Sequence, residues 1–143
     1  MTGIYVVAAA VVLAVAFGIY RAVTDGRARR TQRDDGAARL DAGQLGEPLG
    51  SDATFVQFSS AVCAPCRATH RVLSGITADD DGLAHVEIDA ETRLDLVKEF
   101  GISRTPTVLL LDADGVVRHR IVGAPRKPDV VLALQEVASR RAA

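Results

Sequence analysis

The sequence predicts an α/β domain with a mixed sheet of about four strands and helices on both faces, preceded by one N-terminal transmembrane helix. Residues 3–20 carry no charge, and residues 21–50 are rich in Arg, Ala and Gly. Residues 51–143 alternate apolar runs of period two with runs of helical period. We therefore divide the chain into a transmembrane anchor at 1–20, a linker at 21–50 and a folded domain at 51–143.

The composition excludes two classes of protein. The formal net charge of the 143 residues is −1 and the chain has no Trp, which argues against nucleic acid as a partner. Two cysteines are too few for a disulfide-rich scaffold. A bridge between neighbouring cysteines also removes little chain entropy, because the loop it closes is short. We therefore expect the core to supply the stability and the cysteines to supply chemistry.

The apolar segment GIYVVAAAVVLAVAFGIY at 3–20 is long enough to cross a bilayer, since about 18 helical residues span roughly 27 Å. Tyr5 and Tyr20 lie near its ends, where aromatic rings favour the membrane interface. The basic residues that flank it all follow it: Arg21, Arg27, Arg29, Arg30 and Arg33. The positive-inside rule then places the domain in the cytoplasm, at the cell membrane. The alternative is an extracytoplasmic domain.

Two other interpretations of this segment are weaker. Ala14 and Ala16 form a possible cleavage site, after which residues 1–16 would be removed as a signal peptide. A signal peptide, however, has its basic residues before the apolar core. A buried helix of a soluble protein would show a polar stripe to water. In the linker, the arginines are expected to meet the anionic membrane surface, and the last third to contribute a short element to the domain.

The domain opens with alternating strands and helices. TFVQF at 54–58 is rich in β-formers and predicts a strand. The helix expected at 65–76 has an apolar stripe of Ala68, Val72, Leu73 and Ile76. HVEID at 85–89 predicts a second strand, in which Val86 and Ile88 share one face. The first strand, helix and second strand should form a right-handed parallel crossover.

The second half of the domain predicts a helix, a hairpin and a final helix. The helix at 91–100 has Leu94, Val97 and Phe100 at helical spacing, followed by a stop at Gly101. Two apolar runs within 107–122 surround Asp-Ala-Asp-Gly, which is a hairpin turn; it lacks the later ligands of a calcium loop. The last helix is expected to begin near Pro128. Its apolar face comprises Val130, Val131, Leu134 and Val137.

Both cysteines stand where the first helix begins, in the sequence SSAVCAPCRATH. The unpaired N–H groups and partial positive charge of a helix N-terminus stabilise a thiolate there. Cys63 is placed at that terminus and Cys66 one turn inside it, within reach. This arrangement predicts that Cys63 attacks a substrate disulfide and that Cys66 then releases the substrate from the mixed disulfide. Pro65 suits the first helical turn.

In this order of elements the sequence resembles the thioredoxin superfamily. The resemblance covers about residues 53–140 and is based on FVQFSS, CAPC, HVEID, GISRTPTVLLL and VGAPRK. It implies a thioredoxin-like fold and a thiol–disulfide oxidoreductase with Cys63 and Cys66 as its catalytic residues, and it calls for no cofactor or metal. The implied partners are protein disulfide substrates and a reductase or other dithiol electron donor, with the membrane engaged through residues 3–20.

The resemblance also implies a substrate site. Pro106 would be the family's cis-proline beside the two sulfur atoms, and Thr105 would offer backbone groups to an extended substrate segment. Gly123 resembles the glycine beside the substrate groove. The alternatives are a trans proline that starts a strand and a glycine that merely ends one.

The sequence departs from the family pattern at four positions. Val62 and Ala64 replace the Trp and Gly that usually accompany the cysteines. Gln57 takes the place of a buried aspartate, and His85 the place of its partner lysine. Because an amide does not titrate, we hypothesise that His85, or a water molecule held by Gln57, assists proton transfer to or from Cys66. In the alternative, Gln57 and His85 only hydrogen-bond each other or solvent.

Other functions fit the residues less well. Cys63, Cys66 and His70 have a spacing that could hold zinc, but a structural zinc site needs four ligands and no second pair is present. Arg67 follows Cys66 where a c-type haem signature requires His. A non-catalytic docking module of the same fold at the membrane is the alternative to the enzyme. The compartment decides whether the pair reduces or oxidises its partners.

Overall fold

A computed structural model describes residues 2–30 and 38–142 of the chain. Residues 31–37 of the predicted linker, Arg33 among them, lie outside the described residues. The elements are α1 (Thr2–Thr24), β1 (Ala28–Arg30), α2 (Ala42–Leu45), β2 (Ala53–Ser59), α3 (Ala64–Thr77), β3 (Leu83–Asp89), α4 (Leu94–Glu99), β4 (Thr107–Asp112), β5 (Val117–Val122) and α5 (Lys127–Ala142).

The strands form one mixed sheet in the order β1-β5-β4-β2-β3. β2 and β3 run parallel, whereas the pairs β2–β4, β4–β5 and β1–β5 are antiparallel. The predicted mixed sheet of four strands is therefore confirmed. β1 adds a short fifth strand at one edge, where it pairs with β5. Its three residues show no alternation that would have predicted it.

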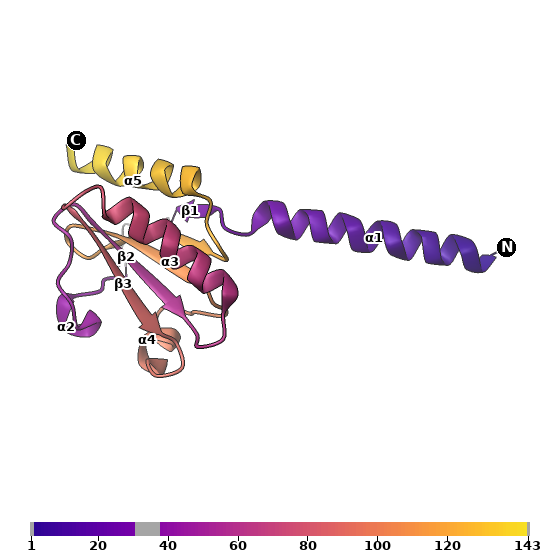
Figure 1. The fold of residues 1–143 in the computed structure, drawn as a ribbon, viewed down its shortest axis with the longest axis horizontal. Helices are drawn as coiled ribbons and strands as arrows, with labels where there is room; N and C mark the ends of the chain where they lie inside the picture. Colours follow the sequence, from indigo (N-terminus) through magenta and orange to yellow (C-terminus); the bar gives the residue numbers. More distant parts are fainter. Residues whose placement is uncertain (1, 31–37, 143) are drawn as a thin grey trace.

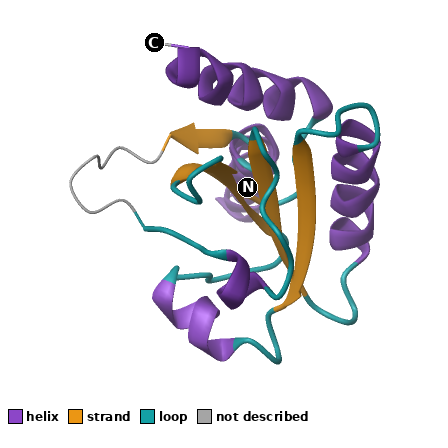
Figure 2. Ribbon diagram, turned by 90° about the vertical axis from the view of Figure 1, so that its left-hand side faces the viewer, coloured by secondary structure: helices purple, strands orange, loops and turns teal. Residues whose placement is uncertain are grey.

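Helices cover both faces of the sheet, as predicted. Figure 2 shows α3 and α5 on one side of the strands and the short helices α2 and α4 on the other. Each layer encloses an apolar cluster: Val56 and Phe58 of β2 contribute to the cluster beside α4, and Phe55 to the cluster beside α3 and α5. β2 is buried along its whole length because it is an interior strand, between β4 and β3.

In two helices, the buried face differs from the apolar stripe that the sequence predicts. In α3, Leu73 and Ile76 are buried as expected, but Thr69 is buried and Ala68 is exposed. In α4, Leu96 is buried while Leu94 is 56% exposed. In α3 the buried face comprises Cys66, Thr69, Leu73 and Ile76, which follow one another at helical spacing. In α4, which begins at Leu94, the inward face comprises Leu96, Val97 and Phe100, so of the predicted stripe only Leu94 lies outside it.

The stretch predicted as a linker contributes to the domain. Asp41 and Gln44 form a capping box at the start of α2, and Leu45 is buried. This helix is the short element expected from the last third of the stretch. Leu40 is also buried, and its N–H donates to the carbonyl of Gly115 at 2.9 Å. These contacts hold the residues before β2 against the hairpin of β4 and β5.

α1 is a single helix that leaves the sheet layers and projects away from them (Figure 1). The segment Gly3–Thr24 is long and apolar enough to cross a membrane. None of its most apolar stretch is buried against the domain. An N-terminal helix of this kind is either a membrane span or a signal sequence.

Candidate active site

The two cysteines form a disulfide at the start of α3. Cys63 is the N-cap residue of the helix, and the S–S distance to Cys66 is 2.02 Å. The backbone N–H of Cys66 donates to Cys63 Sγ at 3.2 Å. Both residues are largely buried, with 8% and 3% exposed. The structure thus places both sulfur atoms where the helix N-terminus can stabilise charge on the first of them.

The loop around the disulfide is apolar and exposed. Ala61, Val62, Ala64 and Pro65 are all exposed, and Val62 is 97% exposed. Pro65 lies in the first turn of α3, where its missing N–H breaks no helical hydrogen bond. The disulfide therefore lies just beneath a small apolar tip that an incoming molecule can contact.

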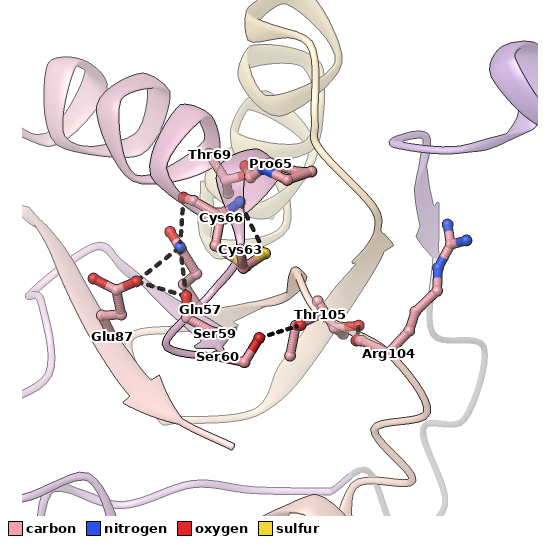
Figure 3. Close-up of a disulfide and its surroundings, with 11 residues drawn as sticks. Gln57, Ser59, Ser60, Cys63, Pro65, Cys66, Thr69, Glu87, Arg104 and Thr105 are labelled. Atoms are coloured by element: carbon pink, nitrogen blue, oxygen red, sulfur yellow. Dashed lines mark hydrogen bonds between the residues drawn. A yellow bond between two sulfur atoms is a disulfide. The ribbon is translucent and has the colours of Figure 1, made fainter. Parts of the chain in front are cut away.

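A second loop meets this tip. The peptide bond between Thr105 and Pro106 is cis, which is the isomer that the resemblance implies. The hydroxyl groups of Thr105 and Ser60 are hydrogen-bonded at 3.1 Å (Figure 3). Gly123 has φ +89° and donates its N–H to the carbonyl of Pro106 at 2.8 Å. The predicted substrate residues Thr105, Pro106 and Gly123 thus lie together, next to the loop that contains Cys63.

Gln57 connects the disulfide to the interior. Its side chain is completely buried, and its amide nitrogen lies 3.0 Å from the carbonyl oxygen of Cys66. The same nitrogen donates to Ser59 Oγ at 2.8 Å and to Glu87 Oε1 at 3.1 Å (Figure 3). A buried amide is tolerated here because its donors are satisfied. The network fixes the first turn of α3 to the end of β2.

His85 completes the environment of Gln57. Its Nε2 lies 3.1 Å from Gln57 Oε1, and its Nδ1 lies 3.3 Å from Ser74 Oγ. Burial is the main reason why its pKa falls from 6.5 to about 4; nearby His70 lowers the pKa further, and Glu87 opposes the shift. His85 is therefore neutral at neutral pH. Because Gln57 Oε1 can only accept, the proton is on Nε2 and Nδ1 accepts from Ser74.

Glu87 joins the network, and the sequence analysis did not identify it. Its Oε1 accepts from Ser59 at 2.6 Å, and its Oε2 lies 2.9 Å from His70 Nδ1. β2 and β3 are parallel and pair Gln57 directly with Glu87. Part of this placement was predictable, because the alternation of His85 and Glu87 with apolar Val86 puts their side chains on one face of the strand. Only the pairing register of β2 and β3 places Glu87 beside Gln57, and no local pattern predicts that register.

The structure does not bring His70 together with the two cysteines as a set of zinc ligands. His70 is on α3 and its Nδ1 faces Glu87 rather than the sulfur atoms. Within residues 2–30 and 38–142, no group of three or more His, Cys, Asp or Glu side chains is placed to hold a metal ion.

Comparison with known families finds that residues 48–138 match the thioredoxin-like domain. Among individual proteins, the chain is 31% identical over 83 residues to thioredoxin M3, chloroplastic, of Oryza sativa subsp. japonica; the match covers 57% of this chain and 47% of that one. The chain thus spans about half the length of the curated relatives it matches.

Solved structures give the same fold. Thioredoxin NaTrxh of Nicotiana alata is 29% identical, with a TM-score of 0.53 over 60% of this chain and 73% of that chain. Chloroplastic thioredoxin z has a TM-score of 0.59 at 20% identity and covers 72% of this chain and 95% of that chain. The second likeness shows the fold alone.

Proposed function

Because the chain belongs to the thioredoxin-like domain family, we propose that it is a membrane-tethered thiol–disulfide oxidoreductase that uses Cys63 and Cys66. One observation carries the proposal. The two cysteines, the only ones in the chain, are joined as a disulfide at the N-terminus of α3. Nothing about the core requires that bridge, since the apolar clusters on both faces of the sheet already supply a packed interior.

The reaction proceeds in two exchange steps. In the reduced protein the Cys63 thiolate attacks one sulfur of a substrate disulfide, and the other substrate sulfur leaves as a thiolate. Cys66 loses its proton and attacks Cys63, which expels the second substrate sulfur. The substrate gains two electrons and the protein returns to the Cys63–Cys66 disulfide. The Cys66 N–H that contacts Cys63 Sγ stabilises the thiolate at the start of this cycle.

The loop of Thr105 and Pro106 receives the substrate. An extended segment adds along Thr105 through backbone hydrogen bonds, as one further strand. Pro106 has no N–H of its own, so it presents an apolar ring to the sulfur atoms. Gly123 lacks a side chain, which lets Arg104, Asp25 and Gly26 approach the backbone closely at this edge. Val62, which replaces a usual Trp, offers the substrate a smaller apolar contact.

Proton transfer involves Gln57 and His85 in this proposal. Two routes were open, through His85 itself or through a water molecule held by Gln57. The contacts argue against His85 as the base, because it directs its only proton to Gln57 and its low pKa makes it a weak base, so the proposal takes the water route. Replacing Gln57 with Ala should therefore slow the release of the mixed disulfide, while His85→Gln should change that rate little. Stopped-flow measurement of the release step with each variant tests the assignment.

The membrane helix and the compartment belong to the same proposal. Residues 3–20 anchor the protein at the cell membrane, and the arginines that follow favour a cytoplasmic domain, with an extracytoplasmic one as the alternative. In the cytoplasm, a reductase or another dithiol would return electrons to the pair. A reporter fused to the C-terminus, together with the mass of the mature chain, tests the orientation and the retention of residues 1–16.

The activity is tested with the full chain in detergent micelles and an insulin-type disulfide substrate. We expect dithiol-dependent reduction that is lost in Cys63→Ser and that stops at a covalent mixed disulfide in Cys66→Ser. Asp114→Ala, at an exposed residue of the turn between β4 and β5, serves as the control and should react like the original protein. The absence of reduction with every dithiol tried would instead favour the non-catalytic docking module.

A further inference from the structure

The end of the membrane helix is bound to the loop that precedes the cis-proline. α1 ends at Thr24, and the next residue, Asp25, forms an ion pair with Arg104 at 2.6 Å. Arg104 directly precedes Thr105 in the chain. The helix end is therefore attached to the same loop that contacts Ser60 beside the disulfide (Figure 3).

The connection between α1 and β1, residues 25–27, is short, and we call it the joint. The N–H of Gly26 donates to the carbonyl of Val122 at 2.8 Å, and Ala28 then pairs with Ile121 at the edge of the sheet. Gly26 has φ +78°, and a Cβ at this position would overlap the carbonyl oxygen of Ala124. Only one residue, Asp25, separates the end of α1 from these contacts. The direction of the helix is thus fixed relative to the sheet.

The joint lies at the end of the domain that holds the disulfide. The strand register pairs Phe58 with Thr107, and Thr107 with Val122, so these three residues share one end of the sheet. The hairpin turn after Asp112 lies at the opposite end, where Asp112 pairs with Ala53. Figure 1 shows α1 leaving from the side on which α3 begins.

The surface at this end suits an anionic bilayer. A cavity of about 470 Å³ lies at the joint, and among the described residues that line it are four arginines and a single acid, Asp25. The arginines are Arg21, Arg27, Arg104 and Arg120. Tyr20, also in the lining, is the last residue of the apolar segment and marks the level of the headgroups. The exposed apolar tip around Val62 lies between the end of β2 and the start of α3, and so at the same end of the domain.

We propose that the disulfide end of the domain faces an anionic membrane surface, so that the pair exchanges with disulfides or dithiols that membrane proteins hold close to the headgroups. This inference rests on the proposed function. In each cycle the Cys63–Cys66 dithiol gives two electrons and two protons to the partner disulfide. The partner leaves as a dithiol, and the protein becomes the disulfide.

The orientation is tested by quenching from the membrane surface. The full chain with Cys66→Ser is labelled at Cys63 with a fluorophore and inserted into phosphatidylglycerol–phosphatidylcholine vesicles that contain headgroup spin-labelled lipid. A matched protein with Cys63→Ser, Cys66→Ser and Asp114→Cys is labelled at the hairpin turn, where Asp114 is exposed. The two ends of a domain of this size are roughly 25 Å apart, which is enough to separate the two signals.

We expect quenching at Cys63 to be several-fold stronger than at Asp114, and to weaken when phosphatidylglycerol is left out. Equal quenching at the two labels, stronger quenching at Asp114, or a chain that does not insert into the vesicles would each overturn the inference. This readout needs no redox activity, so it can fail while the proposed function stands.

The partner class is tested with a disulfide peptide presented in two forms, lipid-anchored in the same vesicles or free in solution. The control protein carries a flexible insert of about 12 Gly and Ser residues between Thr24 and Asp25, which keeps the tether but releases the orientation. We expect the original chain to reduce the anchored peptide several-fold faster than the control, with equal rates on the free peptide. Equal rates on both peptides would overturn the inference. Loss of reduction of the free peptide would overturn the proposed function instead.

Discussion

The two faces of the sheet use the same strands but bury different chemistry. On the face toward α2 and α4, β2 presents Val56 and Phe58 to a purely apolar cluster. On the face toward α3 and α5, the same strand begins with Ala53 and Phe55 but then presents Gln57 and Ser59 beneath the disulfide. β3 behaves likewise, with apolar residues on the first face and His85 and Glu87 on the second.

The difference shows how one domain accommodates a stable core and a polar site. An apolar cluster gains stability from any side chain of suitable volume, because the hydrophobic effect has no direction. A buried amide or imidazole is tolerated only if its partners stand at hydrogen-bonding distance. The apolar face should therefore respond to lost volume, and the polar face to lost partners. The following predictions test that contrast.

The largest effect is expected on the apolar face. Phe58 is fully buried, so Phe58→Ala should lower the free energy of unfolding by about 3–5 kcal/mol through lost burial and a cavity. Urea unfolding followed by circular dichroism measures it. Val62→Ala is the matched control, since Val62 is 97% exposed and its loss should change the stability by no more than about 0.5 kcal/mol. Equal effects from the two substitutions would contradict the assignment of the core.

A smaller loss is expected when Gln57 becomes Leu, although the side chain becomes more apolar. The substitution leaves the Nε2–H of His85 without its acceptor and removes the amide that donates to Ser59 Oγ and to the Cys66 carbonyl, at a cost of about 1–3 kcal/mol in the free energy of unfolding. On the other face, Leu109→Met should cost less than about 1.5 kcal/mol, because its volume is nearly conserved. A Gln57→Leu protein more stable than the original would break the contrast.

The polar face should also add a pH dependence of stability. The pKa of His85 is about 4 in the folded protein against an ordinary value of 6.5, mainly because of burial. Between these values the unfolded chain binds more protons, so stability rises with pH through this window and is lost as the pH falls toward 4. In His85→Gln this contribution disappears. The difference in the free energy of unfolding between the original protein and the variant should therefore change with pH across this window. A difference that stays constant across this window would rule out the lowered pKa of His85.

The smallest effect is expected at the solvent edge of the same network. The side chains of His70 and Glu87 are 48% and 39% exposed, so the hydrogen bond between them is accessible to water. Glu87→Gln keeps a hydrogen-bond acceptor for Ser59 and should change the free energy of unfolding by less than about 1 kcal/mol. Thermal unfolding followed by calorimetry is suitable for so small a difference. A loss as large as that of Gln57→Leu would show that the carboxylate, rather than the buried amide, holds the network together.

Parts of this site were predictable and parts were not. The helix start at Cys63 and the strand at 54–58 followed from local signals, namely the cysteine spacing, Pro65 and the apolar alternation. For Glu87, alternation with Val86 indicated only the face of the strand, and its place beside Gln57 depends on the register of two strands that a helix separates. The edge strand β1 was not predicted for a related reason: three residues of an arginine-rich stretch become a strand only when β5 offers its edge.

By itself, the sequence determined where the apolar segments, the turns and the cysteine pair stand, because periodicity and spacing act over a few neighbouring residues. The tertiary structure alone decided which side chains meet across the chain. It joined Asp25 to Arg104, paired Gln57 with Glu87, and attached the end of the N-terminal helix to the loop that contacts Ser60 near the disulfide. Such contacts depend on the register and packing of segments far apart in sequence, and no local pattern specifies them.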